Sequence, residues 1–109
     1  MALDLRPETE EMLARAETAS AFLKTLAHPA RLMIVCALVE GERSVRALED
    51  GLGLRQPALS QQLAALREAG LIAARKESKS VFYRLADGRA AEFVAVMHRL
   101  FCADGGSET

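Results

Sequence analysis

The sequence lacks the features that mark an exported or membrane-spanning protein. Its first residues, MALDLRPETEEML, are acidic and contain no long apolar run, so we expect no signal peptide. The longest apolar run, LMIVCALV at 32–39, is too short to cross a bilayer. We therefore expect a soluble, cytoplasmic protein with no membrane partner.

Cysteine and histidine are scarce, which limits the chemistry open to this chain. It has 2 cysteines and 2 histidines among 109 residues, and no CxxC motif. The sequence also lacks a nucleophile–base pair, a glycine-rich phosphate loop and a cluster of acids in a pocket-forming context. We predict that the chain is not an enzyme and uses no cofactor. In the absence of an export signal, Cys36 and Cys102 should be reduced by default.

Repeats, low-complexity segments and long linkers are also missing. With 109 residues, 50% of them hydrophobic and 27% charged, the sequence fits one small globular domain over its whole length. A domain of this size buries a modest core and is often stabilised by a partner subunit.

The charge distribution is more informative than the net charge of -1. Residues 1–54 hold six Lys and Arg against nine Asp and Glu, a balance of -3, and residues 90–109 balance to -2. Residues 55–89 hold seven basic against three acidic residues, a balance of +4. A basic middle between acidic ends predicts where a polyanion could dock, although chance surface charge would also give this pattern.

Apolar residues at helical spacing predict two helices in the first part of the chain. The first should run from Pro7 to about Leu26, with acidic residues in its first turn. The second should begin near Pro29 and end before Gly41. It is apolar almost all round and should be the most buried element.

The next segment, 44–69, has the layout of a helix-turn-helix. Ser44 is a candidate N-cap for a short helix over 45–50, which Gly51 and Gly53 should end. Pro57 can open a further helix that ends at Gly70. A short helix, a glycine-containing turn and a second helix define the motif.

A β-hairpin and a last helix complete the predicted order. LIAARK and SVFYRL are joined by the polar residues ESK, which predicts a basic hairpin, or wing, over 71–86. Asp87 should cap a helix over 88–102. The predicted fold is mainly α with a small β-hairpin: a winged helix-turn-helix of five helices and a two-stranded wing. Excess apolar surface on the first and last helices favours a homodimer through both, the alternative being packing within one monomer.

The second helix of the motif carries uncharged polar residues where a surface helix usually carries charge. Amides and hydroxyls match the donors and acceptors on base edges in the major groove, and recognition helices present their N-terminal residues there. A merely solvated polar face is the alternative. The candidates for reading bases are Gln56, Ser60 and Gln61, with Gln62 near the edge of the face, from where it could point to the backbone instead. Arg55, directly before them, is a further candidate for DNA binding.

Basic residues of the hairpin are candidates for phosphate or minor-groove contacts. They are Arg75, Lys76, Lys79 and Arg84. Arg84 alternates with buried neighbours and could instead pair with an acid. Ser44 could hold a phosphate at a helix N-terminus or act as a plain cap. A two-fold dimer would place its recognition helices one DNA turn apart, roughly 34 Å, which predicts an inverted-repeat operator in double-stranded DNA.

Two blocks, LKTLAHPARLMIVCALVEGERSV and LRQPALSQQLAALREAGLIAARKESKSVFYRL, resemble the signature blocks of the ArsR family of bacterial winged-helix repressors. The resemblance covers about 11–102. Within the family, Cys36 in RLMIVCALVEGE and Cys102 in RLFCA are similar to the cysteines of the sulfide-responsive group called BigR, SqrR and YgaV. This resemblance implies a dimer that senses persulfides through two thiols and releases DNA when the two thiols are bridged. HlyU-type regulators share the same pair, so the target genes stay open.

Many ArsR relatives bind metals, and here the sequence departs from them. The helix over 45–50 lacks the paired cysteines of the arsenic, cadmium and lead sensors, and the last helix lacks the ligand spacing of the zinc sensors. His98 and Cys102 could share a helix face, but two ligands make a weak site. We therefore predict no metal, with a metal-responsive repressor as the alternative.

The cysteine pair itself supports more than one reading. A cysteine inside LMIVCALV, such as Cys36, is usually a small core residue. Sensing needs two thiols within reach, because one thiolate attacks a persulfide and the second resolves the adduct. A direct disulfide needs Cα atoms within about 7 Å, whereas a polysulfide bridge tolerates a wider gap. The effector could be a persulfide, a polysulfide or another oxidant. A redox-insensitive DNA-binding regulator with structural cysteines is the remaining alternative.

Overall fold

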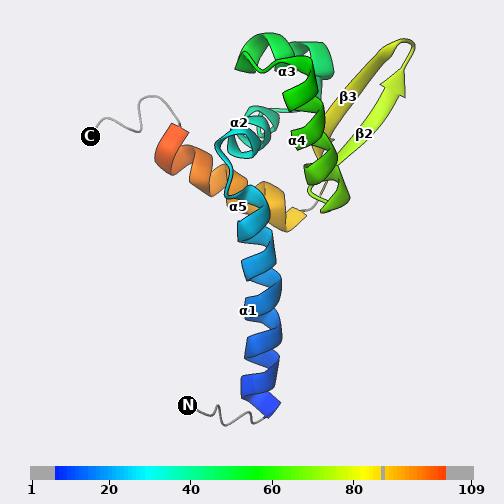
Figure 1. The fold of residues 1–109 in the computed structure, drawn as a ribbon. Coiled ribbons are helices and arrows are strands. Elements are labelled where there is room, and N and C mark those ends of the chain that lie inside the picture. The colour runs from blue at the N-terminus through cyan, green and yellow to red at the C-terminus, as the bar shows by residue number, and fades with distance from the viewer. Residues whose placement is uncertain (1–6, 87, 103–109) are drawn as a thin grey trace.

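The computed structural model describes residues 7–86 and 88–102, with side chains up to Phe101. Five α-helices, three short strands and a final π-helical turn follow one another along the chain (Figure 1). They are α1 (Pro7–Leu26), α2 (Pro29–Leu38), β1 (Arg43–Ser44), α3 (Val45–Leu52), α4 (Gln56–Glu68), β2 (Ile72–Glu77), β3 (Ser80–Leu85), α5 (Gly88–Met97) and η1 (His98–Cys102). This order confirms the predicted winged helix-turn-helix and its five helices.

One apolar core holds the helices and the base of the sheet together. α2 and α4 each contribute three buried side chains, and α4 supplies them at the helical spacing that the sequence indicates: Ile34, Val35, Leu38, Leu59, Leu63 and Leu66. α3 adds one buried leucine, Leu48, and α5 adds Ala90 and Val94. α2 is the most buried element, as expected, since only Pro29 and Met33 of its residues are exposed.

The sheet has three strands, not the two that the hairpin predicts. The strand order is β1-β3-β2, and both pairs are antiparallel. β1 pairs Arg43 with Tyr83 and Ser44 with Phe82. A two-residue strand leaves no alternating pattern in the sequence, and so β1 could not be predicted. The hairpin turn is shorter than predicted, because Glu77 belongs to β2 and only Ser78 and Lys79 connect the strands.

The helix-turn-helix has slightly different limits from those predicted. α3 continues through Gly51 to Leu52 and ends at Gly53, whose φ of 68° is the left-handed conformation that glycine adopts at helix ends. α4 begins at Gln56. The last α-helix ends at Met97, where the π-helical turn begins. The predicted cap, Asp87, lies outside the described residues.

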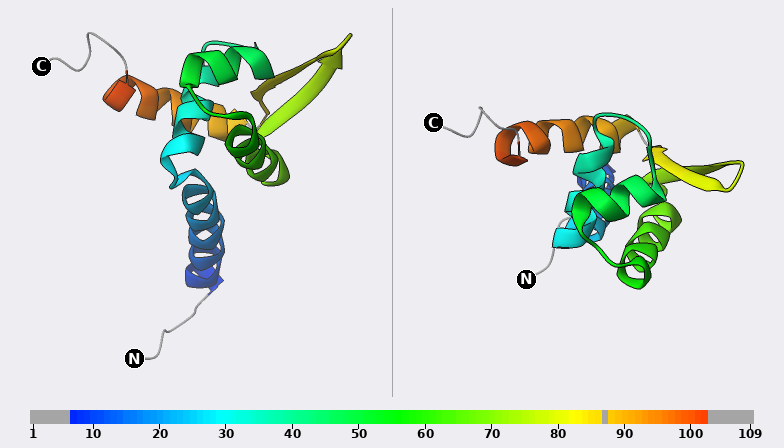
Figure 2. Two further views of the ribbon diagram at one scale, coloured as in Figure 1. Left: turned by 45° about the horizontal axis from the view of Figure 1, so that its top comes forward. Right: turned by 90° about the horizontal axis from the view of Figure 1, so that it is seen from above.

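α1 extends away from the other helices (Figure 1). Only Leu26, at its last position, is buried, and residues 11–21 are exposed throughout. Near that end, the rings of Phe22 in α1 and Phe93 in α5 meet edge to face, with centroids 5.4 Å apart. The wing and the end of α5 project in opposite directions from the body (Figure 2). No single helix in the described part of the chain is long and apolar enough to span a membrane; α1 and α2 meet that length-and-composition test only as a pair bent by 96°.

Candidate DNA interface and thiol site

α4 has two chemically different faces. One face consists of three leucines that are buried in the core, and Leu59 and Leu66 are fully inaccessible to solvent. The opposite side is polar, exposed and uncharged apart from Arg55, and we call Arg55, Gln56, Ser60 and Gln61 the polar face of α4. Arg55 occupies the N-cap position in extended conformation, and Ser60 Oγ donates a 3.0 Å hydrogen bond to Gln56 Oε1. The predicted N-terminal readers therefore lie together and accessible.

Gln62 is separated from this group. It is half-buried, and its Oε1 accepts a 2.8 Å hydrogen bond from Arg31 Nε of α2. Arg31 Nη1 also donates to the carbonyl oxygen of Thr25, near the end of α1, at 3.0 Å. Gln62 therefore links α4 to α2 and does not belong to the polar face.

A groove of about 810 Å³ joins α3, the start of α4 and the tip of the wing. Its lining includes Ser44, Arg46, Glu49, Asp50, Gln56, Lys79 and Ser80. Ser44 caps α3, since its Oγ accepts a 3.0 Å hydrogen bond from the Ala47 amide. The sequence analysis missed Arg46, an exposed cation one residue inside α3. Its position in the first turn of α3, two residues after the capping serine, is the signal that could have identified it.

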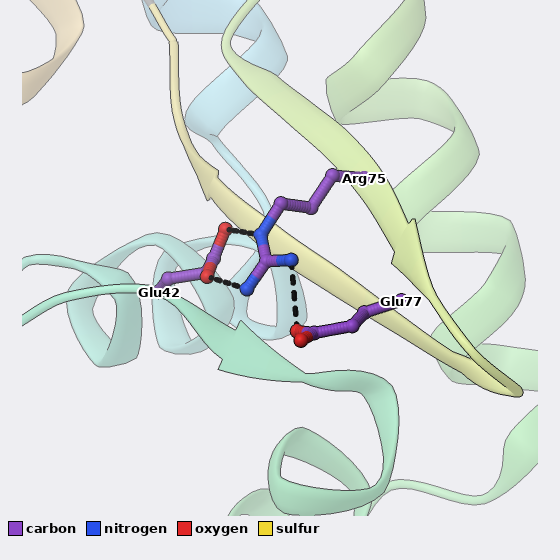
Figure 3. A network of polar contacts seen from close by, with 3 residues as sticks. All are labelled: Glu42, Arg75 and Glu77. Carbon is purple, nitrogen blue, oxygen red and sulfur yellow. Dashed lines mark hydrogen bonds and ion pairs between the residues drawn. The ribbon is translucent and has the colours of Figure 1, made fainter.

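The remaining basic residues of the wing differ in their surroundings. Lys76, Lys79 and Arg84 are exposed on β2, the turn and β3. Arg75, in contrast, is held between two carboxylates (Figure 3). Its Nε and Nη2 each donate to Glu42 at 2.8 Å, its Nη1 donates to Glu77 at 3.0 Å, and its guanidinium lies 4.7 Å from the centroid of Phe82.

This network shifts the protonation equilibria of both partners. The hydrogen bond from Arg75 lowers the pKa of Glu42 below the ordinary value of 4.5, and the charges of Arg75 and Arg84 add to the effect. The hydrogen bonds from the two carboxylates raise the pKa of Arg75 above its ordinary value. The pair therefore remains ionised at neutral pH.

Cys36 lines a largely apolar cavity of about 390 Å³, which we call the thiol cavity. Apolar side chains form most of its wall: Leu32, Met33, Ala37, Leu52 and Met97. His98, Glu40 and Arg43 are its polar residues. His98 opens the π-helical turn that Cys102 closes, so the C-terminal turn adjoins the half-buried Cys36. The side chain of Cys102 lies outside those described. π-Helical turns are frequent at functional sites.

Large apolar side chains are exposed on three adjoining elements. They are Met12, Leu13 and Leu23 on α1, Phe93 and Val96 on α5, and Leu100 and Phe101 on η1; Met33 on α2 is exposed as well. Phe101 is 76% exposed and Met12 is 67% exposed. Within the described residues, no group of three or more His, Cys, Asp or Glu is arranged to hold a metal ion.

Comparisons with known proteins agree with this architecture. Residues 28–74 match the family model described as bacterial regulatory protein, arsR family. The biofilm growth-associated repressor of Xylella fastidiosa is 50% identical over 102 residues, which cover 92% of this chain and 90% of that protein.

Solved structures are similar at the level of the whole fold. The transcriptional repressor BigR from Xylella fastidiosa has a TM-score of 0.80 and 50% identity, covering 85% of this chain and 92% of that one. Reduced HlyU from Vibrio cholerae has a TM-score of 0.83 and 41% identity, covering 86% and 99%. The homodimeric winged helix-turn-helix DNA-binding domain of Mb0332 from Mycobacterium bovis has a TM-score of 0.69 and 31% identity, covering 90% and 87%.

These relatives are regulators by name, in agreement with the prediction that the chain is not an enzyme. Together with the fold and the exposed polar face of α4, they show that the chain belongs to the ArsR family of bacterial regulatory proteins and resembles BigR within it.

Proposed function

We propose that this chain is a sequence-specific DNA-binding repressor that acts as a homodimer in the cytoplasm. The observation that carries the proposal is the polar face of α4, exposed and uncharged apart from Arg55 while the leucines behind it are buried. Gln56, Ser60 and Gln61 offer base edges the donors and acceptors of a major-groove reader. Arg55, Arg46, Lys76, Lys79 and Arg84 supply the positive charge that phosphates attract.

The exposed apolar side chains of α1, α5 and η1 support association through these elements. A monomer rarely leaves so many large apolar groups in water, and a two-fold partner would cover them. The homodimeric relative Mb0332 is consistent with this arrangement. A two-fold dimer presents two copies of α4, so the operator should be an inverted repeat whose half-sites lie about 34 Å apart.

Selection of duplexes from a random pool, followed by fluorescence anisotropy over a salt series, tests the DNA-binding part. We expect an inverted repeat to be enriched and its affinity to fall steeply with salt, because phosphate contacts release counterions. Gln61→Ala should relax the base preference. Failure to enrich any sequence, or affinity independent of salt, would contradict the proposal. A promoter–reporter fusion checks the direction of control, since relatives include a named repressor of Xylella fastidiosa.

We further propose that Cys36 and Cys102 sense persulfides and related oxidants. The position of Cys36 in the thiol cavity, with His98 of the turn that ends at Cys102, supports this pairing. The Cys36 thiolate attacks the outer sulfur of a persulfide RSSH, which gives a Cys36 persulfide and releases RS⁻. The Cys102 thiolate then attacks the inner sulfur, which forms a disulfide and releases HS⁻. A second RSSH consumed before that step would lengthen the bridge by one sulfur.

Such a bridge would join the helix that precedes the DNA-reading motif to the last helical turn. It would hinder the dimer from adopting the geometry that DNA requires, so we expect the bridged protein to bind its operator less tightly. Intact-mass spectrometry with and without an organic persulfide, paired with DNA binding on the same samples, tests this step. We expect loss of two hydrogens for a disulfide, or that loss together with a gain of one sulfur atom for a longer bridge, accompanied by release of DNA.

Cys36→Ser and Cys102→Ser provide the controls. Each should remove the bridge and the release while leaving the binding of untreated protein unchanged. If both variants still release DNA when persulfide is added, the cysteines are structural and the sensor proposal is wrong. Release by a metal salt and not by persulfide would instead favour a metal-responsive repressor.

A further inference from the structure

Arg75 crosses the whole sheet from one outer strand to the other. In the register of the sheet, Arg75 on β2 lies opposite Phe82 on β3, and Phe82 lies opposite Ser44 on β1. These three residues form one cross-strand row, and Glu42 precedes Ser44 by two positions, the spacing that returns to the same face. The guanidinium passes over the ring of Phe82, the middle residue of the row, to reach Glu42.

The contact at the far end uses the full geometry of the guanidinium. Nε and Nη2 face the two carboxylate oxygens of Glu42 in a bidentate pair, and Nη1 is directed at Glu77 (Figure 3). Single exposed ion pairs contribute little to stability, but bidentate geometry within a network is the recognised exception. Three of the five N–H donors of Arg75 are engaged in this network, so Arg75 has less capacity to contact a phosphate than the sequence suggested.

The wing is buried at its base and exposed in its outer part. Leu71 and Ile72 are buried where β2 begins, whereas 75–80 are exposed. β1 pairs with β3 at two positions only, Phe82 and Tyr83. A hairpin with so little apolar support is marginally stable by itself. The contact between Arg75 and Glu42 ties β2 to the segment that joins α2 to β1.

We propose that Glu42 and Arg75 form a strut that holds the wing in the orientation at which Lys76 and Lys79 reach DNA. This inference rests on the proposed DNA binding and assigns Arg75 a positioning role in place of direct contact. Glu42 then strengthens binding to a polyanion despite its own negative charge. Electrostatic repulsion alone would predict the opposite effect.

The strut also ends beside the thiol cavity. Arg43, the neighbour of Glu42, lines that cavity, donates a 2.9 Å hydrogen bond to the carbonyl oxygen of Ala37 and pairs with Glu40 at 3.2 Å. Residues 40–43 therefore contact the cavity wall on one side and the wing on the other. A change in the cavity has a short physical route to the wing through this segment.

Fluorescence anisotropy with the selected inverted-repeat duplex, at several salt concentrations, tests the strut. We expect Glu42→Gln and Arg75→Gln each to weaken binding by about fivefold, a change of the size that coupling between contacting residues produces. The double variant should bind no more weakly than either single variant, because both substitutions remove the same contact. The salt slope should fall in Glu42→Gln too, because the wing lysines lose their phosphates.

Glu77→Gln is the matched control. It removes a carboxylate from the same guanidinium, but that carboxylate belongs to the wing itself and ties it to nothing else. We expect its affinity to stay within about twofold of wild type. The charge-swapped pair Glu42→Arg with Arg75→Glu should recover part of the lost affinity.

Two results would overturn the strut. One is tighter or unchanged binding by Glu42→Gln, which would make Glu42 a mere competitor for a DNA-contacting Arg75. The other is an Arg75→Gln effect that Glu42→Gln does not share. If the wild-type protein selects no duplex, the proposed function fails while the strut is still tested by amide hydrogen exchange. Exchange in 75–82 should then accelerate in Glu42→Gln and not in Glu77→Gln, and equal protection in all three proteins would refute it.

Discussion

The guanidinium of Arg31 in α2 donates a 2.8 Å hydrogen bond to the side-chain amide of Gln62 in α4. The neighbouring Gln61 is exposed. Two consecutive glutamines on one helix therefore have different tasks, because a helix turns by about 100° between adjacent residues. One faces the protein and the other faces solvent where DNA would approach.

Substitution of these two residues should separate stability from specificity. Gln62→Ala removes the acceptor of Arg31 Nε, which keeps only its bond to the Thr25 carbonyl, and should lower the free energy of unfolding by about 1 kcal/mol, measured by urea denaturation. Gln61→Ala should leave that free energy unchanged and reduce discrimination against wrong bases by about 1 to 3 kcal/mol. If Gln62→Ala changes the preferred base instead, our assignment of the two glutamines is reversed.

Arg46 should contribute one phosphate contact in the groove between α3 and the wing. Arg46→Gln is expected to weaken binding to all duplexes alike and to reduce the slope of log K against log salt by about 1.8, which is about 0.9 for each subunit of the dimer. Arg67→Gln, an exposed cation in the last turn of α4, is the control and should leave the slope unchanged. An unchanged slope for Arg46→Gln would remove this residue from the interface.

Ser44 offers a choice between capping and binding phosphate. Ser44→Ala removes the acceptor for the Ala47 amide and should cost about 1 kcal/mol of stability, whereas Ser44→Asp keeps an acceptor and should restore it. Thermal melting measures this comparison. If Ser44 served phosphate and not α3, the alanine variant would keep its melting temperature and lose affinity for DNA.

The exposed side chain of Met12 should lie within the proposed dimer interface. Met12→Glu places a charge on that surface and should convert the dimer to monomer in sedimentation measurements, with weaker operator binding as a consequence. Arg46→Glu, on α3 outside this surface, should lose DNA binding and remain dimeric. A dimeric Met12→Glu protein would place the interface elsewhere.

Acidification should release the wing at a pH set by Glu42. Its pKa in the folded protein is lowered by the hydrogen bond from Arg75, so its contribution is present above its unfolded pKa. The contribution is lost as the pH falls below the ordinary value of 4.5 and through the lower folded-state pKa. The chain has 1 tyrosine and no tryptophan, so the fluorescence of Tyr83 on β3 reports on the wing during titration. Glu42→Gln should lack this transition; its presence there would assign it to another group.

Local patterns predicted most of the helices, and they failed where distant residues decide the outcome. The spacing of Leu59, Leu63 and Leu66 identified α4 and its buried side. The partner of Arg75 lies 33 positions away, and no local pattern indicates that Glu42 would reach it. The two residues of β1 became a strand only because β3 lies beside them. Gln62 looked like a surface residue because its partner, Arg31, belongs to another helix.

The sparse packing of α1 has a consequence for how much active protein a cell holds. A helix of 20 residues with one buried side chain has little to keep it helical when it is alone in water. Because a partner protomer would cover α1 in the proposed dimer, the fraction of chains with a helical α1 would rise and fall with protomer concentration by mass action. Dilution alone should lower the helical circular dichroism signal, and a cell that makes few copies would hold mostly chains with an unwound first segment.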